Sequence, residues 1–212
     1  MTAQFHTPTR ALTPGRTALL LLDLQHSLLD TLPDADGLLE RAQRTQRAAL
    51  AADIREVHVR VAFTPEDHAA VPAHNKAFAP LARSGALGEG EPANDFHQVL
   101  RATGNAPHTV TKTRVSAFST TSLDPFLREQ GIDTLVLGGI FTSGAILSTV
   151  RDAADRDYRL LVLSDACADL DPQVHRTLLE SVLPTQADVL DVTAFEAAAA
   201  AARNPGSGRP GH

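Results

Sequence analysis

Cysteine is scarce in this chain of 212 residues, since Cys167 is the only one. A single cysteine cannot form an intrachain disulfide framework or a cysteine-rich metal site, so both are excluded. No apolar run approaches the roughly 20 residues that cross a bilayer; the strongly apolar run Ala18–Leu22 is far shorter. The first ten residues, MTAQFHTPTR, also contain no apolar leader segment. We therefore expect a cytoplasmic protein without a membrane partner.

Basic residues are also in the minority, with 19 Lys and Arg against 25 Asp and Glu and a formal net charge of −6. Nucleic acids and anionic membranes bind clustered Lys and Arg, so this balance argues against both partners. The composition, 43% hydrophobic and 21% charged, is that of a globular protein. The length fits one ordinary domain with a sizeable core.

Short apolar runs alternate with longer segments of helical spacing. The predicted strands are 17–22, 57–63, 109–110 with its flanks, 134–137, 160–163 and 189–192. The predicted helical faces lie within 38–50, 123–127, 146–154 and 174–182. Parallel strands need crossover connections of about a dozen residues or more. The alternation therefore predicts an α/β sandwich with a parallel sheet of about six strands covered on both faces.

The predicted domain covers residues 15–203, between an N-terminal extension at 1–14 and a disordered tail at 204–212. Residues 64–107 are rich in Ala, Pro and Gly and show no convincing periodic helix before Phe96. A connection of this length is usually functional, so we expect a lid or an oligomer contact there.

Candidate site residues follow from the rule that ligands bind at the carboxyl ends of the strands in an open parallel sheet. The residues that this rule selects are Asp23 and Gln25 after the first strand, Phe63 at the end of the second, Lys112 and Arg114 at the third, and Phe141, Thr142, Ser143, Gly144 and Ala145 after the fourth.

Asp23 and Lys112 stand out among these residues. A carboxyl group at the end of an apolar strand has a raised pKa unless a cation compensates for burial, and Lys112 could be that cation. Such a pair can exchange a proton with a substrate. The alternative is that Asp23 only caps a turn and Lys112 is a solvated strand end.

The glycine-rich turn Gly138–Ala145 leads from a strand into a helix that is expected to begin near Ser143. Unpaired N–H groups at a helix start attract negative charge, so this turn could hold an oxyanion or a carboxylate. Alternatively, the glycines only allow close packing, and Ser143 is a helix cap rather than a nucleophile.

Four stretches of the sequence together resemble the isochorismatase-like hydrolases, the superfamily that includes nicotinamidases and N-carbamoylsarcosine amidohydrolases. The stretches are LLLLDLQ (Leu19–Gln25), VTKTRVSAF (Val110–Phe118), GIDTLVLGGIFTSGAILSTVRDA (Gly131–Ala153) and YRLLVLSDACAD (Tyr158–Asp169). The resemblance covers about residues 15–195. It implies a Rossmann-like three-layer sandwich with a six-stranded parallel sheet, commonly assembled as a homodimer or homotetramer. It also implies a cis peptide bond at Ile140–Phe141.

The resemblance further implies that Asp23 and Lys112 correspond to two members of the Asp-Lys-Cys triad of the amidase branch. The cysteine position of the G-x-x-T-x-x-C pattern falls on Ala145, so the thiol is missing. Amide hydrolysis in this family needs a covalent nucleophile, which an alanine methyl cannot provide. Cys167 lies beyond the predicted fifth strand, and no rule brings it to the turn after the fourth. The Asp-x-His metal pattern of the nicotinamidases is also missing, because Asp67 and His68 are adjacent, so we expect no metal or other cofactor.

The thiol-free branch of the family is therefore the leading interpretation. True isochorismatases resemble this chain in lacking the cysteine, and they hydrolyse an enol ether with the aspartate as general acid. We expect a hydrolase for a small anionic substrate, with Asp23 as acid and Lys112 orienting the substrate. Arg114 and Lys76 are candidates for recognising a carboxylate. Two alternatives stay open: a ligand-binding protein that has lost the chemistry, or a scaffolding protein that uses the 64–107 insert.

Overall fold

The computed structural model describes residues 11–100 and 107–203, which form a six-stranded sheet. Its strands are β1 (Thr17–Leu22), β2 (Arg55–Val61), β3 (His108–Lys112), β4 (Thr134–Ile140), β5 (Arg159–Ala168) and β6 (Asp188–Leu190). Every neighbouring pair is parallel, in the order β3-β2-β1-β4-β5-β6. The α/β class and the six-stranded parallel sheet are thereby confirmed.

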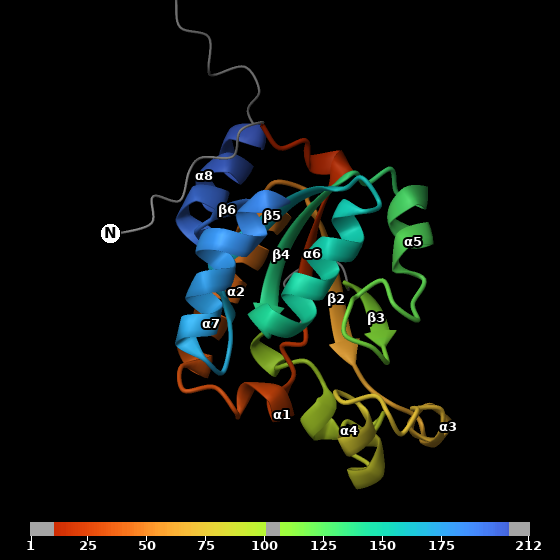
Figure 1. Ribbon diagram of the computed structural model, residues 1–212. Helices are drawn as coiled ribbons and strands as arrows, with labels where there is room; N and C mark the ends of the chain where they lie inside the picture. The colour runs from red at the N-terminus through yellow and green to blue at the C-terminus, as the bar shows by residue number, and fades with distance from the viewer. Residues whose placement is uncertain (1–10, 101–106, 204–212) are drawn as a thin grey trace, which may run out of the picture.

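Helices cover both faces of the sheet, as Figure 1 shows. The helices are α1 (His26–Leu29), α2 (Ala35–Ala51), α3 (Pro65–Ala69), α4 (Ala79–Ser84), α5 (Leu123–Glu129), α6 (Leu147–Ala154), α7 (Pro172–Thr177) and α8 (Val192–Arg203). Short 3-10 or π turns are η1 (Pro14–Arg16), η2 (Pro92–Asn94), η3 (Gln98–Leu100), η4 (Thr142–Ile146), η5 (Leu178–Val182) and η6 (Leu183–Thr185). Side chains of α5, α6 and η5 pack on one face of the sheet, and those of α1, α2 and α8 pack on the other.

The central strand β1 shows why both faces need covering. All six of its residues are buried. Leu20 and Leu22 belong to the core under α5 and α6, whereas Leu19 and Leu21 belong to the core under α2 and α8. Successive side chains of a strand point to opposite faces, so an uninterrupted apolar run is stable only between two helical layers.

The sheet reverses its strand order between β1 and β4, which are neighbours from Thr17–Thr134 to Leu22–Gly139. The chain leaves β1 toward α1 and α2 on one face and leaves β4 toward η4 and α6 on the other. Because the two connections diverge, the carboxyl ends of β1 and β4 mark the position where ligands usually bind in such sheets, the crevice between the two connections.

The insert between β2 and β3 corrects one prediction, since it holds α3 and α4 before Phe96. A capping box starts α3: the Thr64 hydroxyl accepts the Asp67 N–H, and the Asp67 carboxylate accepts the Thr64 N–H. Gly85, with φ +67°, ends α4. Helices of five and six residues are too short to show a hydrophobic period, so the sequence pattern missed them. Val61, Phe63, Phe78 and Leu87 form a small core beneath them.

Strand β5 is longer than predicted and extends to Ala168. Cys167 therefore lies inside β5, opposite Gly139 of β4, and not beyond the strand as expected. A register shift between Leu137 and Gly139 accommodates the added residues of β5. Polar Ser164 and Asp165 interrupt the apolar run of β5 and concealed this extension in the sequence.

The predicted terminal segments lie largely outside the described residues, which exclude 1–10 and 204–212. From the predicted extension at 1–14, Leu12 is buried in the core under α2 and α8. The alanine-rich stretch before residue 204 forms the end of α8. Across the described part of the chain, no helix is both long enough and apolar enough to cross a bilayer.

Candidate active site at the β1–β4 crevice

Asp23 occupies a constrained position directly after β1. Its backbone has φ +56°, and its N–H donates to the Val59 carbonyl at 2.7 Å. A non-glycine residue in this region is uncommon and is held there by its surroundings. Gly139 of β4 lies against it: a Cβ at Gly139 would stand 2.1 Å from the Leu22 carbonyl oxygen. Only glycine therefore lets β4 approach the exit of β1 so closely.

Lys112 and Asp23 form a buried ion pair, with 2.7 Å between Nζ and Oδ2. Their side chains are 3% and 7% exposed. The other carboxyl oxygen, Oδ1 of Asp23, is buried and has no hydrogen-bond partner. Burial raises the pKa of Asp23, and the charge and hydrogen bond of Lys112 oppose that rise. The structure thus brings together the two residues that the sequence selected.

The turn after β4 contains Ala145. The Ile140–Phe141 peptide bond is cis, as predicted, and a π turn over Thr142–Ile146 precedes α6. The helical conformation therefore starts at Thr142, in agreement with the predicted start near Ser143. Ala145 is buried in the same core cluster as Leu22. Its methyl group offers no polar atom for chemistry.

Two backbone N–H groups of this turn, those of Ser143 and Gly144, have internal partners. The Ser143 N–H donates to Oδ2 of Asp169 at 2.6 Å, and the Gly144 N–H donates to the Phe141 carbonyl at 3.0 Å. A carboxylate therefore does bind at the turn, but it is the side chain of Asp169. The predicted contacts of Thr142, Ser143 and Gly144 with substrate stay predictions.

Thr142 ties the turn to β5 and α7. Its hydroxyl lies 3.1 Å from the Ala168 carbonyl and 2.8 Å from Nδ1 of His175. Burial lowers the pKa of His175, while the charge of Asp169 opposes that effect. Sequence reasoning missed both His175 and Asp169. Asp169 directly follows β5, but the sequence pattern placed the end of that strand at residue 163, and α7 brings its histidine back only through tertiary packing.

The side-chain amide of Gln25 is hydrogen-bonded to backbone groups. Its Oε1 accepts the Val61 N–H at 2.8 Å, and its Nε2 donates to the carbonyls of Val61 and Asn94 at 3.0 and 2.7 Å. The side chain thus joins β1, β2 and the insert, and its predicted contact with substrate stays a prediction.

Phe63 is 1% exposed and stacks on His68, with 4.9 Å between ring centroids. The His68 ring also hydrogen-bonds the Ala86 carbonyl through Nε2. Phe63 supports the insert from below in this structure. Its predicted contact with substrate is not tested by this packing.

Arg114 lines a polar cavity of about 440 Å³ with Asp67, Ala70, Glu89, Thr111, Thr113 and Thr120. Its Nη1 donates to the Thr113 carbonyl at 2.6 Å, and its guanidinium lies 5.9 Å from the centre of the Phe78 ring. Asp23 and Lys112 do not line this cavity. The second candidate for a carboxylate, Lys76, is exposed in the insert.

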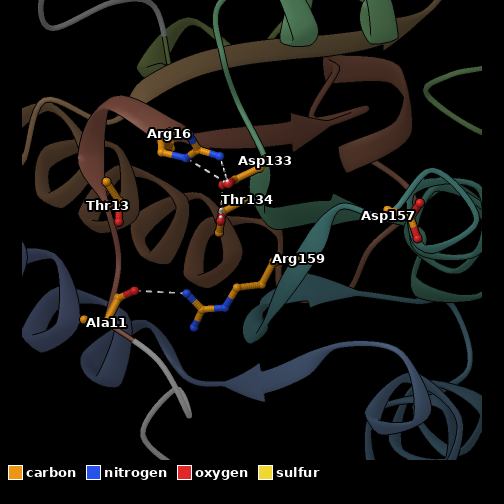
Figure 2. Close-up of a pocket in the computed structure, with 7 residues that line it drawn as sticks. All are labelled: Ala11, Thr13, Arg16, Asp133, Thr134, Asp157 and Arg159. Atoms are coloured by element: carbon orange, nitrogen blue, oxygen red, sulfur yellow. Dashed lines mark hydrogen bonds and ion pairs between the residues drawn. The ribbon is translucent and has the colours of Figure 1, made fainter.

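Another polar cavity, of about 280 Å³, lies at the opposite, amino ends of the strands (Figure 2). Arg16 before β1 pairs with Asp133 before β4, and Arg159 of β5 donates to the Ala11 carbonyl at 3.1 Å. The polar groups of this cavity thus bind one another. It lies away from the crevice that Asp23 borders.

Other candidate nucleophiles and metal ligands are poorly placed. Burial raises the pKa of the Cys167 thiol to about 12, so the thiol stays protonated at neutral pH. Thr142 is fully buried and its hydroxyl is already hydrogen-bonded. Among the residues that the structure describes, no three His, Cys, Asp or Glu side chains gather as a metal site.

Comparison with known proteins places this geometry in context. The model of the isochorismatase domain matches residues 17–194. Ureidoacrylate amidohydrolase RutB of Methylorubrum extorquens is 33% identical over 175 residues, which cover 76% of this chain and 69% of that enzyme. RutB of Methylobacterium radiotolerans is 42% identical over 88 residues, 41% of this chain and 34% of that enzyme. The matches thus span between a third and about two thirds of the length of these relatives.

Among solved structures, a cysteine hydrolase from Pseudomonas syringae superposes with a TM-score of 0.81 at 22% identity. The superposition covers 95% of this chain and all of that one. At this identity the likeness concerns the fold, and it agrees with the sheet order described above.

Proposed function

The chain belongs to the isochorismatase family, and from this premise we propose that it is a hydrolase of a small molecule that works without a cysteine nucleophile. The observation that carries the proposal is the buried Asp23–Lys112 pair, in which the second carboxyl oxygen of Asp23, Oδ1, has no hydrogen-bond partner. Relatives named as amidohydrolases support hydrolysis as the reaction class. Because residue 145 is an alanine and offers no thiol, we do not propose covalent catalysis at this position.

Asp23 is suited to act as a general acid. Burial raises its pKa, which favours the protonated carboxyl form that can donate a proton. Its Oδ2 is held by Lys112, so the free Oδ1 is the oxygen available to a substrate. Lys112 then stabilises the carboxylate that remains after the proton has left.

An enol ether, with isochorismate as the first to test, suits these groups. The Asp23 proton moves to the alkene carbon and gives an oxocarbenium ion, to which water adds. The water returns a proton to the Asp23 carboxylate, and the hemiketal collapses to a carbonyl compound and an alcohol. No protein nucleophile takes part, which agrees with Ala145 at the turn.

The test is turnover of enol ethers by wild type, Asp23→Asn and Lys112→Met. Loss of a general acid typically costs 10²–10⁴-fold in rate, and we expect Asp23→Asn to fall within or beyond that range. Asp171→Asn is a suitable folded control with the same change in net charge. Full activity of Asp23→Asn on any substrate found would refute the proposed role.

The second candidate function is ligand binding without catalysis, which Ala145 also favours. In that case the enol ethers and amides would bind without turnover. Restoring the thiol distinguishes further: if Ala145→Cys gains amidase activity, the pocket of an amidase has been kept. Trimming the 64–107 insert and assaying partner pull-down tests the scaffolding alternative.

The remaining expectations complete the proposal. We expect a small-molecule substrate, no required cofactor, and a homodimer or homotetramer, which sedimentation analysis would measure. The single, buried cysteine is compatible with the cytoplasm as compartment.

A further inference from the structure

Asp169 places a negative charge where the turn after β4 would otherwise receive an anion. Its Oδ2 accepts the Ser143 N–H at 2.6 Å, and its Oδ1 accepts the Leu170 N–H at 2.8 Å. Both carboxyl oxygens are thus engaged, and the side chain is held between β5 and the turn. An N–H group that already donates to a carboxylate is not available to a second one.

The neighbouring contacts keep this arrangement in place. Thr142 bonds the Ala168 carbonyl, one residue before Asp169, and His175 contacts the same hydroxyl from α7. Three contacts therefore join the turn to the end of β5 and to α7, so the Asp169 carboxylate is held at the turn.

We propose that Asp169 determines the charge specificity of the crevice, so that an uncharged carbonyl or hydroxyl of the substrate lies at the turn and its anionic group lies toward Lys112. The inference rests on the proposed function, because it assumes that substrate enters the crevice beside Ala145. Repulsion between two like charges about 6–8 Å apart, at an effective dielectric constant of about 20–40, amounts to roughly sixfold to a hundredfold in affinity.

The experiment introduces a thiol into the turn and compares two alkylating reagents that differ in charge. Ala145→Cys is made in a Cys167→Ala background, so that only the new thiol reacts. Its alkylation rate is measured with neutral iodoacetamide and with anionic iodoacetate, each of which forms a C–S bond as iodide leaves. Any change in the pKa of the thiol affects both rates equally, so the ratio of rates reports the charge preference of the turn.

Asp169→Asn keeps an amide oxygen that can accept the Ser143 N–H but removes the charge. We expect it to raise the iodoacetate-to-iodoacetamide ratio about tenfold, and Asp169→Ser to act in the same direction. Asp171→Asn is the matched control: Asp171 is two residues away, also accepts backbone N–H groups and carries the same charge. We expect its ratio to stay within twofold of the parent.

Other outcomes have distinct meanings. An unchanged ratio in both Asp169 variants would overturn the role of Asp169. Equal acceleration of both reagents would show that Asp169 changes only the ionisation or the accessibility of the thiol, and it would overturn the role in charge specificity as well. No alkylation by either reagent would show that small molecules do not reach Ala145, which refutes the proposed active site itself. A second measurement needs no variant of Asp169: the ratio should rise as the salt concentration increases from 0.05 to about 1 M, because salt screens the carboxylate.

Discussion

Replacing Lys112 by Met is expected to make the stability of the protein depend on pH in a way that identifies Asp23 as the cause. The two groups are 2.7 Å apart and almost fully buried. At an effective dielectric constant of about 20, two unit charges at this separation attract by ~6 kcal/mol. Met has similar length but no charge, so the variant leaves the Asp23 carboxyl without compensation in a low-dielectric site.

Protonation limits the resulting loss of stability. The buried carboxyl of Lys112→Met can become neutral, at a cost of about 1.4 kcal/mol for each pH unit above its ordinary pKa of 3.8. At pH 7 this limit is about 4 kcal/mol, in line with the ~3–5 kcal/mol measured when one partner of a buried pair is removed. Because the pKa of the Asp23 carboxyl is raised in the folded state, its contribution to the stability of the variant is fully present below pH 3.8. This contribution is lost as the pH rises through the pKa of the folded state.

The assay is urea unfolding of Lys112→Met and of the double variant Asp23→Asn/Lys112→Met between pH 4 and pH 7. We expect the difference between their free energies of unfolding to change by about 1.4 kcal/mol per pH unit, with the single variant losing stability as pH rises. The double variant supplies the control, since it has no carboxyl at position 23. A difference that does not change with pH would refute the assignment of Asp23 to a low-dielectric site.

Three other predictions concern the residues around this pair. Gln25→Leu removes three buried hydrogen bonds to backbone and should cost about 3 kcal/mol in urea unfolding; a loss below about 1 kcal/mol would contradict the contacts described. Gly139→Ala should lower the free energy of unfolding by more than about 3 kcal/mol, because its Cβ would meet the Leu22 backbone at φ +128°, whereas Gly15→Ala has open space and should be nearly neutral. Cys167, with a pKa of about 12, should not react with a thiol reagent at pH 8 until urea unfolds the chain; rapid labelling of the native protein would contradict its burial.

The fold was predictable because its signals are strong and local. The continuous apolar run of β1 predicts a strand covered on both faces, and the structure buries all of it. Residues outside such runs were harder to assign. The polar Ser164 and Asp165 concealed the second half of β5, although Ser164 is buried and bonds the Leu190 carbonyl. An apolar pattern cannot reveal a strand whose polar side chains find partners inside the protein.

The candidate site was predictable as far as it depends on strand ends. Asp23 and Lys112 lie 89 positions apart, yet both end strands that a parallel sheet brings to one edge. The roles of individual groups depend on tertiary contacts that spacing does not contain. The rule of strand ends selects Gln25 as well as Asp23, but the side-chain amide of Gln25 donates hydrogen bonds to the backbone carbonyls of Val61 and Asn94. Asp169 reaches Ser143 only because β5 pairs with β4.

An alanine at position 145 is compatible with the hydrogen bond between the Ser143 N–H and the Asp169 carboxylate. A thiol at a helix start ionises readily because unpaired N–H groups favour the thiolate. The carboxylate of Asp169 on the Ser143 N–H works against such ionisation, since it brings a like charge to the same turn. With Ala145, nothing at the turn has to become an anion, so the carboxylate does not oppose the proposed chemistry. The Ala145→Cys thiol should therefore have a higher pKa with Asp169 present than in Asp169→Asn. Measuring its alkylation by iodoacetamide against pH gives both values, and equal pKa values would contradict this account.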